Sequence, residues 1–275
     1  MIILGGSSRQ SLASLRGSLD QSLKSVSALD CSTVSADLFV VLGSLGTSIG
    51  LRRALTDPSR DVASKVALVE DIFGKVIGKV ALSLVGNAVA LRWSSPSEFT
   101  DGIEQIAIEA EASAANVNDK LDLVQDELFE FARILIANGE LRQALASRTD
   151  EAAHKEALVH DIFASKFNDS SVRLLDELVD GLRGRSIEQT LAAYTHGVAA
   201  RRDRVTAHVR TAIALSDAQR SKLATALAAQ IGQPVHINVE IDSAILGGIS
   251  IRFADEVIDG TIVSRLAEAS RALVG

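Results

Sequence analysis

The sequence predicts an α+β protein in which two tandem all-α helical bundles are followed by a small α/β C-terminal domain. Apolar residues recur at helical spacing through the first three quarters of the chain. One segment recurs 90 residues later, and strand-like alternation begins only after residue 204. We therefore expect domains at residues 1–110, 111–203 and 204–275.

An internal repeat is the clearest sign of the tandem bundles. Residues 51–73 recur as residues 141–163, an offset of 141 − 51 = 90, with 12 of 23 positions identical. Ordinary composition would give about one or two identities over that length. The shared residues are mostly aliphatic, so we interpret the duplicated segment as a packing unit and not as a catalytic one.

Stripes of apolar residues and helix-end signals define the helices. The stripes are Leu12, Leu15, Leu19 and Leu23; Val34, Leu38, Val41 and Leu45; and Val124, Leu128, Phe131 and Leu135. Asp57 before Pro58 predicts an N-cap with proline at the first helical position, and Ser95 before Pro96 predicts another helix start. Asn138 followed by Gly139 predicts a helix end.

The last 70 or so residues change period. Apolar and polar residues alternate over 205–210, 235–241 and 249–253, which predicts half-buried strands. Ser216 and Gln219 form a capping box at the start of a helix. Asp259 and Gly260 predict a turn from a short strand into a final helix.

Composition excludes several classes of protein. The formal net charge of −7 argues against a nucleic-acid partner, which is polyanionic. The single cysteine, Cys31, excludes an intrachain disulfide framework and suits a reducing compartment. The apolar stretch 81–91 is about half the length that a bilayer demands, so we expect no direct membrane insertion.

No arrangement of residues in the sequence indicates catalysis, a metal or a cofactor. Gly247 and Gly248 could in principle cradle an anion or a nucleotide, but they precede a strand and not a helix. We favour a tight turn with positive φ at this pair. His208 and His236 could meet only if their strands pair, and two histidines without further ligands make a weak metal site.

Two groups of residues near the end of the second bundle are candidates for binding a partner. Positive charge gathers at Arg183, Arg185, Arg201, Arg202 and Arg204, where it could contact an acidic partner or form local ion pairs. Apolar side chains lie at helical spacing at Ile187, Leu191 and Tyr194, which could form core or a partner-binding surface.

The C-terminal domain resembles the delta subunit of F-type ATP synthase, the family that includes the oligomycin sensitivity-conferring protein. The resemblance is carried by an acidic residue, an apolar pair, two glycines, a strand with a basic residue and a closing Ile-Asp-Gly. These residues are Asp242, Ile245, Leu246, Gly247, Gly248, Arg252, Ile258, Asp259 and Gly260. The second helical copy resembles the family's helical domain, and the extra first copy is typical of the enlarged actinobacterial form.

This resemblance implies a non-catalytic stator subunit without cofactors. Its implied partners are the N-terminal helices of the head's alpha subunits and the b-type peripheral stalk. Its implied location is the cytoplasmic face of the bacterial plasma membrane, as a peripheral part of a complex for ATP synthesis and hydrogen ion transport. The alternatives are a helical adaptor for unrelated amphipathic helices and a small anion- or nucleotide-binding protein that uses Gly247 and Gly248.

Overall fold

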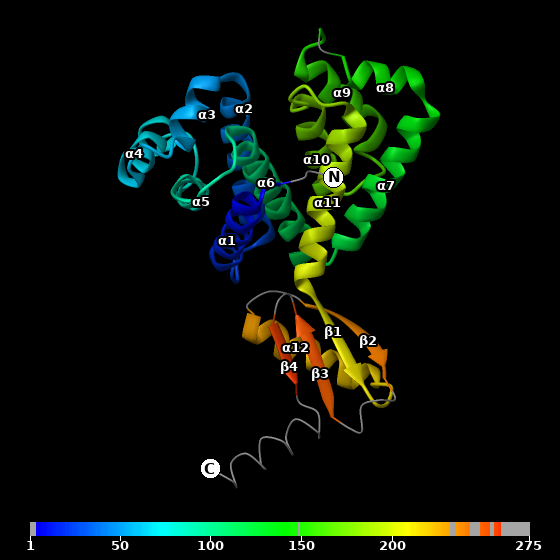
Figure 1. Cartoon of the computed structure of the whole chain (residues 1–275). Helices are drawn as coiled ribbons and strands as arrows, with labels where there is room; N and C mark the ends of the chain where they lie inside the picture. The colour runs from blue at the N-terminus through cyan, green and yellow to red at the C-terminus, as the bar shows by residue number, and fades with distance from the viewer. Residues whose placement is uncertain (1–3, 148, 232–234, 243–247, 254–255, 260–275) are drawn as a thin grey trace. The chain divides into compact units, whose positions relative to one another are not determined.

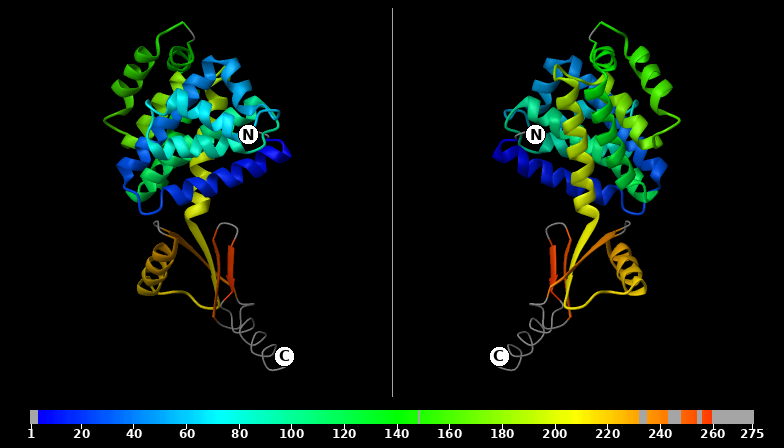
Figure 2. Two further views of the ribbon diagram at one scale, coloured as in Figure 1. Left: turned by 90° about the vertical axis from the view of Figure 1, so that its left-hand side faces the viewer. Right: turned by 90° about the vertical axis from the view of Figure 1, so that its right-hand side faces the viewer.

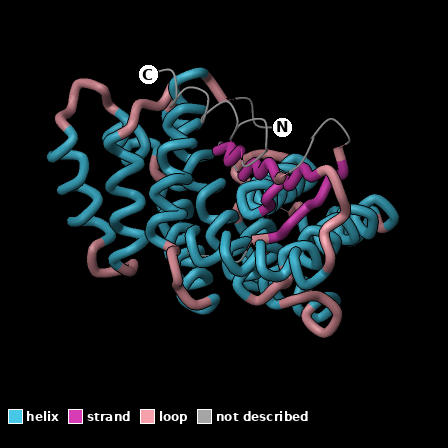
Figure 3. Tube along the Cα trace, turned by 90° about the horizontal axis from the view of Figure 1, so that it is seen from below, coloured by secondary structure: helices cyan, strands magenta, loops and turns pink. Residues whose placement is uncertain are grey.

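The computed structural model describes residues 4–147, 149–231, 235–242, 248–253 and 256–259. The chain divides into two compact units, Met1–Ala200 and Arg201–Gly275. The first unit is helical, and the strands all belong to the second (Figures 1 and 3). A mostly helical chain with a small mixed sheet at its C-terminal end confirms the predicted α+β class.

Helices α1 to α11 account for the first unit, and the last of them continues past residue 200. Their bounds are α1 Gly6–Ser22, α2 Ala28–Thr47, α3 Ile49–Thr56, α4 Val62–Phe73, α5 Lys79–Ala90, α6 Pro96–Val117, α7 Leu121–Ala137, α8 Gly139–Leu145, α9 Ala152–Phe163, α10 Asp169–Asp180 and α11 Ile187–Val205. Short turns join them, and no helix of this unit has a proline in its interior.

The repeat of the sequence is also a repeat of structure. The bounds of α4 and α5 plus 90 are the bounds of α9 and α10. The contacts repeat as well, because α4 packs on α5 as α9 packs on α10, and α1 packs on α5 as α6 packs on α10. Helix α6 therefore closes the first copy and opens the second.

Helix α6 is buried around its whole circumference from Gly102 to Asn116. A helix that is buried on every side lies in the middle of its domain. Figure 1 shows α6 between the helices of the two copies, which overlap along the line of sight in the side views of Figure 2. The expected boundary at residue 110 falls inside this helix, so the two copies share one compact unit where we expected two bundles.

Helix ends follow the sequence at some places and not at others. Ser95 caps α6 by accepting a hydrogen bond from the backbone N–H of Glu98 at 3.2 Å, with Pro96 at the first position as predicted. Helix α7 ends at Asn138 as predicted. The prediction for Asp57 was wrong, because its carboxylate holds the backbone of Ser59 in a turn at 2.8 Å and Asp61 caps α4 instead.

The second unit is a four-stranded sheet with strand order β2-β1-β3-β4. Its elements are β1 Thr206–Thr211, α12 Asp217–Ile231, β2 His236–Ile241, β3 Ile249–Phe253 and β4 Glu256–Asp259. Strand β1 pairs parallel with β2 and antiparallel with β3. The predicted capping box is confirmed, since Ser216 and Gln219 exchange hydrogen bonds of 2.9 and 3.3 Å.

One side of this sheet forms the small core of the second unit. Leu223 and Leu227 of α12 pack with Ala207, Val209 and Ile251 of the sheet. The alternation of buried and exposed side chains along β1 matches the strand pattern read in the sequence.

Helix α2 is long and apolar enough to cross a membrane by length and composition alone, with a mean hydropathy of 1.5 over its best window. The structure gives it a different role. Its buried residues include Leu38, Val41 and Leu45, and it packs along α6. We therefore interpret α2 as a core helix of the first unit.

Candidate partner-binding sites

Three glutamates of α6 are buried, and each faces an arginine from another segment. Glu109 accepts a hydrogen bond of 2.6 Å from Nε of Arg16 in α1. Glu111 lies 2.7 Å from Nη2 of Arg173 in α10. Because Arg16 belongs to the first copy and Arg173 to the second, ion pairs connect both copies to α6.

The third glutamate, Glu104, is fully buried and has two cationic partners. Arg183 and Arg185, in the loop between α10 and α11, reach its carboxylate at 2.5 and 2.6 Å. The loop turns sharply here, with φ of 51° at Arg183 and 81° at Gly184. This left-handed turn lets two nearby guanidinium groups meet one carboxylate, and breaking such a buried pair costs about 3–5 kcal/mol.

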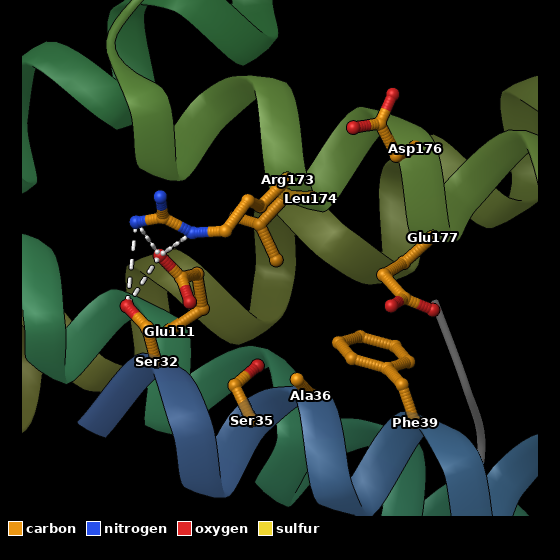
Figure 4. Close-up of a pocket in the computed structure, with 9 residues that line it drawn as sticks. All are labelled: Ser32, Ser35, Ala36, Phe39, Glu111, Arg173, Leu174, Asp176 and Glu177. Carbon is orange, nitrogen blue, oxygen red and sulfur yellow. Dashed lines mark hydrogen bonds and ion pairs between the residues drawn. The ribbon is translucent and has the colours of Figure 1, made fainter. Parts of the chain in front are cut away.

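A small cavity of about 100 Å³ lies where α2, α6 and α10 meet (Figure 4). Arg173 bridges Glu111 and Ser32 on one side of it, at 2.7 and 3.3 Å. On the other side, Glu177 of α10 lies beside the ring of Phe39 of α2. The cavity is thus a polar seam between the first and the second copy.

Burial and neighbouring carboxylates change the acidity of the residues in this seam. Burial raises the pKa of Glu177 to about 7, and the negative charges of Asp180, Glu156, Asp176 and Glu111 raise it further in the same direction. Burial also raises the pKa of Asp176, although His160 at 2.9 Å lowers it. The seam therefore favours a protonated Glu177 near neutral pH.

The residues predicted to contact a partner in α11 lie instead in the core. Ile187, Leu191 and Tyr194 are at most 4% exposed. The ring of Tyr194 stacks on Phe39 with centroids 6.1 Å apart. Of the two alternatives for these residues, their burial supports core and not a partner-binding surface.

The arginines of the predicted basic cluster differ in burial and in their partners. Arg183 and Arg185 are used by Glu104, and Arg201 is 1% exposed. Arg202 is partly exposed and lies 3.8 Å from Asp203. The side chain of Arg204 lies outside the described residues. Of the two alternatives for these charges, the local ion pairs are therefore present at Arg183 and Arg185.

The family motif borders strands of the second unit. Asp242 follows β2 and forms an ion pair with Arg210 of β1. Gly248 has φ of 87° directly before β3, which confirms the positive φ predicted for this residue. Arg252 of β3 is exposed and opposite His208 of β1.

The rest of the motif can be placed only in part. Asp259 ends β4, where its backbone pairs with Ser250. Leu246, Gly247 and Gly260 lie outside the described residues. His236 is opposite Thr206, and His208 is opposite Asn238, so the register does not bring the two histidines face to face.

Two polar contacts occur at equivalent positions of the two copies and were not predicted from the sequence. Asp37 of α2 accepts a hydrogen bond from the N–H of Gly78 at 2.8 Å, and Glu127 of α7 accepts from the N–H of Asn168 at 3.0 Å. Both pairs differ by 90 residues, since 127 − 37 = 168 − 78 = 90. The sequence feature that could have predicted these contacts is an acidic residue at the same position of both copies.

Comparison with known proteins agrees with this architecture. The family model described as ATP synthase delta (OSCP) subunit matches residues 109–273. The ATP synthase subunit delta of Streptomyces coelicolor is 39% identical over 268 residues, covering 98% of this chain and 97% of that protein. The one of Acidothermus cellulolyticus is 40% identical over 271 residues, covering 98% of each.

These two alignments extend over nearly the whole chain, so they include the first helical copy as well as the part that the family model matches. A chain of the Toxoplasma gondii mitochondrial ATP synthase hexamer covers 61% of this chain at 19% identity, but its TM-score of 0.31 is too low to support a statement about the fold. On the sequence similarity alone, the chain belongs to the ATP synthase delta (OSCP) subunit family.

Proposed function

We propose that this chain is a non-catalytic stator subunit that links the catalytic head of an F-type ATP synthase to its b-type peripheral stalk. The observation that carries the proposal is the similarity to ATP synthase delta subunits over nearly the full length of both chains. In this proposal the chain resists the torque of the rotor at the cytoplasmic face of the membrane.

The construction of the helical unit supports a mechanical role. A stator must transmit force without yielding, and close-packed helices with low compressibility do so. Helix α6 holds both copies, through the apolar contacts around it and through Glu104, Glu109 and Glu111. We interpret the helical unit as two tandem bundles that share α6, which gives one stiff body from a duplicated sequence.

The partners follow the division of the chain in this proposal. The helical unit holds N-terminal helices of the head's alpha subunits, and the sheet unit holds the end of the b-type stalk. The anion-binding alternative has less support, because Gly248 leads into strand β3 and not into a helix N-terminus.

The test is a reconstitution of the complex in vesicles with and without this chain. ATP hydrolysis by the head should continue without it, whereas ATP-driven proton pumping should fall to background, because an unbraced head turns with the rotor. Equal pumping in both preparations would overturn the proposal. Calorimetry with ATP, ADP and phosphate should show no binding to the isolated chain.

A further inference from the structure

Arginines gather in a groove between α3 and the first turn of α6, which we call the α3 groove. It measures about 470 Å³, and Arg52, Arg53 and Arg183 line it. Ser97 and Thr100 of α6 add hydroxyl groups to the lining. Among the residues that the structure describes, no acidic residue belongs to this lining. The α3 groove therefore attracts a negatively charged group.

The three arginines differ in how their charges are compensated. Arg183 donates hydrogen bonds of 3.0 and 2.5 Å to two carboxylates of α6. Nη1 of Arg52 donates to two backbone carbonyls at the end of α2, at 2.7 and 3.2 Å, which holds its side chain in place. Neither Arg52 nor Arg53 makes an ion pair with any residue that the structure describes. Two positive charges of the groove thus have no counter-charge, and one of them is already positioned.

The second copy has the equivalent arginine with a counter-charge of its own. Arg142 corresponds to Arg52, since 142 − 52 = 90, and it lies 3.9 Å from a carboxylate oxygen of Glu188 in α11. Gln143 stands at the position of Arg53. The equivalent place in the second copy therefore has one positive charge fewer and one negative charge more.

The residue of the first copy that corresponds to Glu188 is a serine. Ser95 caps α6 and Ser186 caps α11, each by accepting a hydrogen bond of 3.2 Å from the backbone N–H three residues later. Glu188 is two residues after its cap, and Ser97 is two residues after the other cap. The second copy thus supplies a carboxylate to its arginine, whereas the first copy has a hydroxyl at that place and leaves the carboxylate to a ligand.

The lining also decides which kind of carboxylate fits. A guanidinium group matches the planar geometry of a carboxylate with two parallel hydrogen bonds. Ile49 lines the same groove and is 57% exposed, so a ligand with an apolar side chain beside its carboxylate gains apolar burial there. An acidic peptide segment has both groups, and an inorganic anion has only the charge. Two copies of a chain with a net charge of −7 repel each other, which favours a different polypeptide.

We propose that the α3 groove binds an acidic segment of another polypeptide. One carboxylate of the segment pairs with Arg52, as Glu188 pairs with Arg142 in the second copy. A second carboxylate pairs with Arg53, and an apolar side chain between them packs on Ile49. The proposal does not depend on the stator role, since the isolated chain should show this binding.

The probe is a short labelled peptide in which glutamates flank one central leucine, and fluorescence anisotropy follows its binding to the full chain. We expect saturable binding that Arg53→Ser weakens about tenfold, which corresponds to the loss of one charge-assisted contact. Gln143→Ser, at the equivalent position of the second copy, is the matched control and should leave the affinity unchanged. The same peptide with glutamine in place of every glutamate should not bind.

A substitution at Ser97 tests the comparison of the two copies directly. Ser97→Glu gives the first copy the carboxylate that the second copy has, so the new side chain should pair with Arg52 and weaken peptide binding about tenfold. Ser97→Gln has nearly the same size without the charge and should bind the peptide as the wild type does. Ser97 is exposed, so neither variant should lower the midpoint of thermal unfolding.

Hydrogen exchange locates the bound peptide, which should slow amide exchange within residues 49–56 of the wild-type chain. Slowing only elsewhere, undiminished binding to Arg53→Ser or Ser97→Glu, or displacement of the peptide by inorganic phosphate beyond the effect of ionic strength would each overturn the proposal. Self-association of the chain that Arg53→Ser abolishes would also overturn it, because a second copy would then be the occupant. None of these results would bear on whether the complex pumps protons without the chain, so the stator role is tested separately.

Discussion

Phe39 and Tyr194 stack on each other with ring centroids 6.1 Å apart and an angle of 27° between the rings, although they lie in different copies of the repeat. Each is almost completely buried. An aromatic pair at this distance contributes about 0.5–1.5 kcal/mol beyond the apolar area that it buries. The Phe39–Tyr194 contact joins the two copies directly, in addition to the contacts that each copy makes with α6. The two copies therefore share a continuous core.

The hydroxyl of Tyr194 gives the first prediction. Its oxygen is buried and has no hydrogen-bond partner among the residues that the structure describes. Tyr194→Phe keeps the ring and removes that group, so we expect the free energy of unfolding to stay the same or rise by up to about 1 kcal/mol. Tyr194→Ala removes the ring and should cost about 3–5 kcal/mol.

Urea unfolding followed by helical circular dichroism measures both variants. A loss of more than about 1 kcal/mol in Tyr194→Phe would mean that the hydroxyl is bonded in solution. The hydroxyl would then stabilise the fold through a hydrogen bond, and its burial would not be destabilising.

The paired charges of α6 give the second prediction. Glu104→Ala removes the fully buried carboxylate that Arg183 and Arg185 share, so the free energy of unfolding should fall by about 3–5 kcal/mol. Glu130→Ala removes an exposed partner of Arg133 and should change the stability by less than about 1 kcal/mol. Similar losses in the two variants would show that the Glu104 cluster contributes little.

The helices could be located from the sequence because their apolar residues repeat with the period of a helix. Segment 62–73 and its copy at 152–163 are alike in sequence and form α4 and α9. That both copies use the same helix, α6, could not be predicted from this periodicity. Its equivalence to α1 is visible in the contacts, because α6 packs on α10 as α1 packs on α5.

The binding surfaces were harder to predict than the helices. Ile187 belongs to an apolar stripe and is 1% exposed, whereas Phe129 is an apolar residue outside the stripe of its helix and is 53% exposed. Periodicity indicates which side of a helix is apolar, but the burial of that side depends on packing between distant segments. The sequence left open whether Arg183 and Arg185 form ion pairs or contact a partner, because their carboxylate partner, Glu104, is about 80 positions earlier in the chain.

The turn before β3 gives the third prediction. Gly248 has φ of 87°, a conformation that a β-branched residue adopts only under strain. Gly248→Val should lower the free energy of unfolding of the sheet unit by about 1–3 kcal/mol. Asn238→Val is the control, because Asn238 is an exposed residue inside β2, where valine fits. Unchanged protection of β1 and β3 amides in Gly248→Val would disprove the role of the turn.

The seam between α2 and α10 gives the last prediction. Burial raises the pKa of Glu177 to about 7, so folding favours its protonated form. That contribution is complete below about pH 4.5 and is lost as the pH rises through 7, by at most about 3 kcal/mol. Glu177→Gln, which stays neutral, should therefore exceed the wild type in stability at pH 8 and match it near pH 4 in urea unfolding. Glu70→Gln, at an exposed residue of α4, is the control. If the difference in free energy of unfolding between Glu177→Gln and the wild type is the same at both pH values, the account is contradicted.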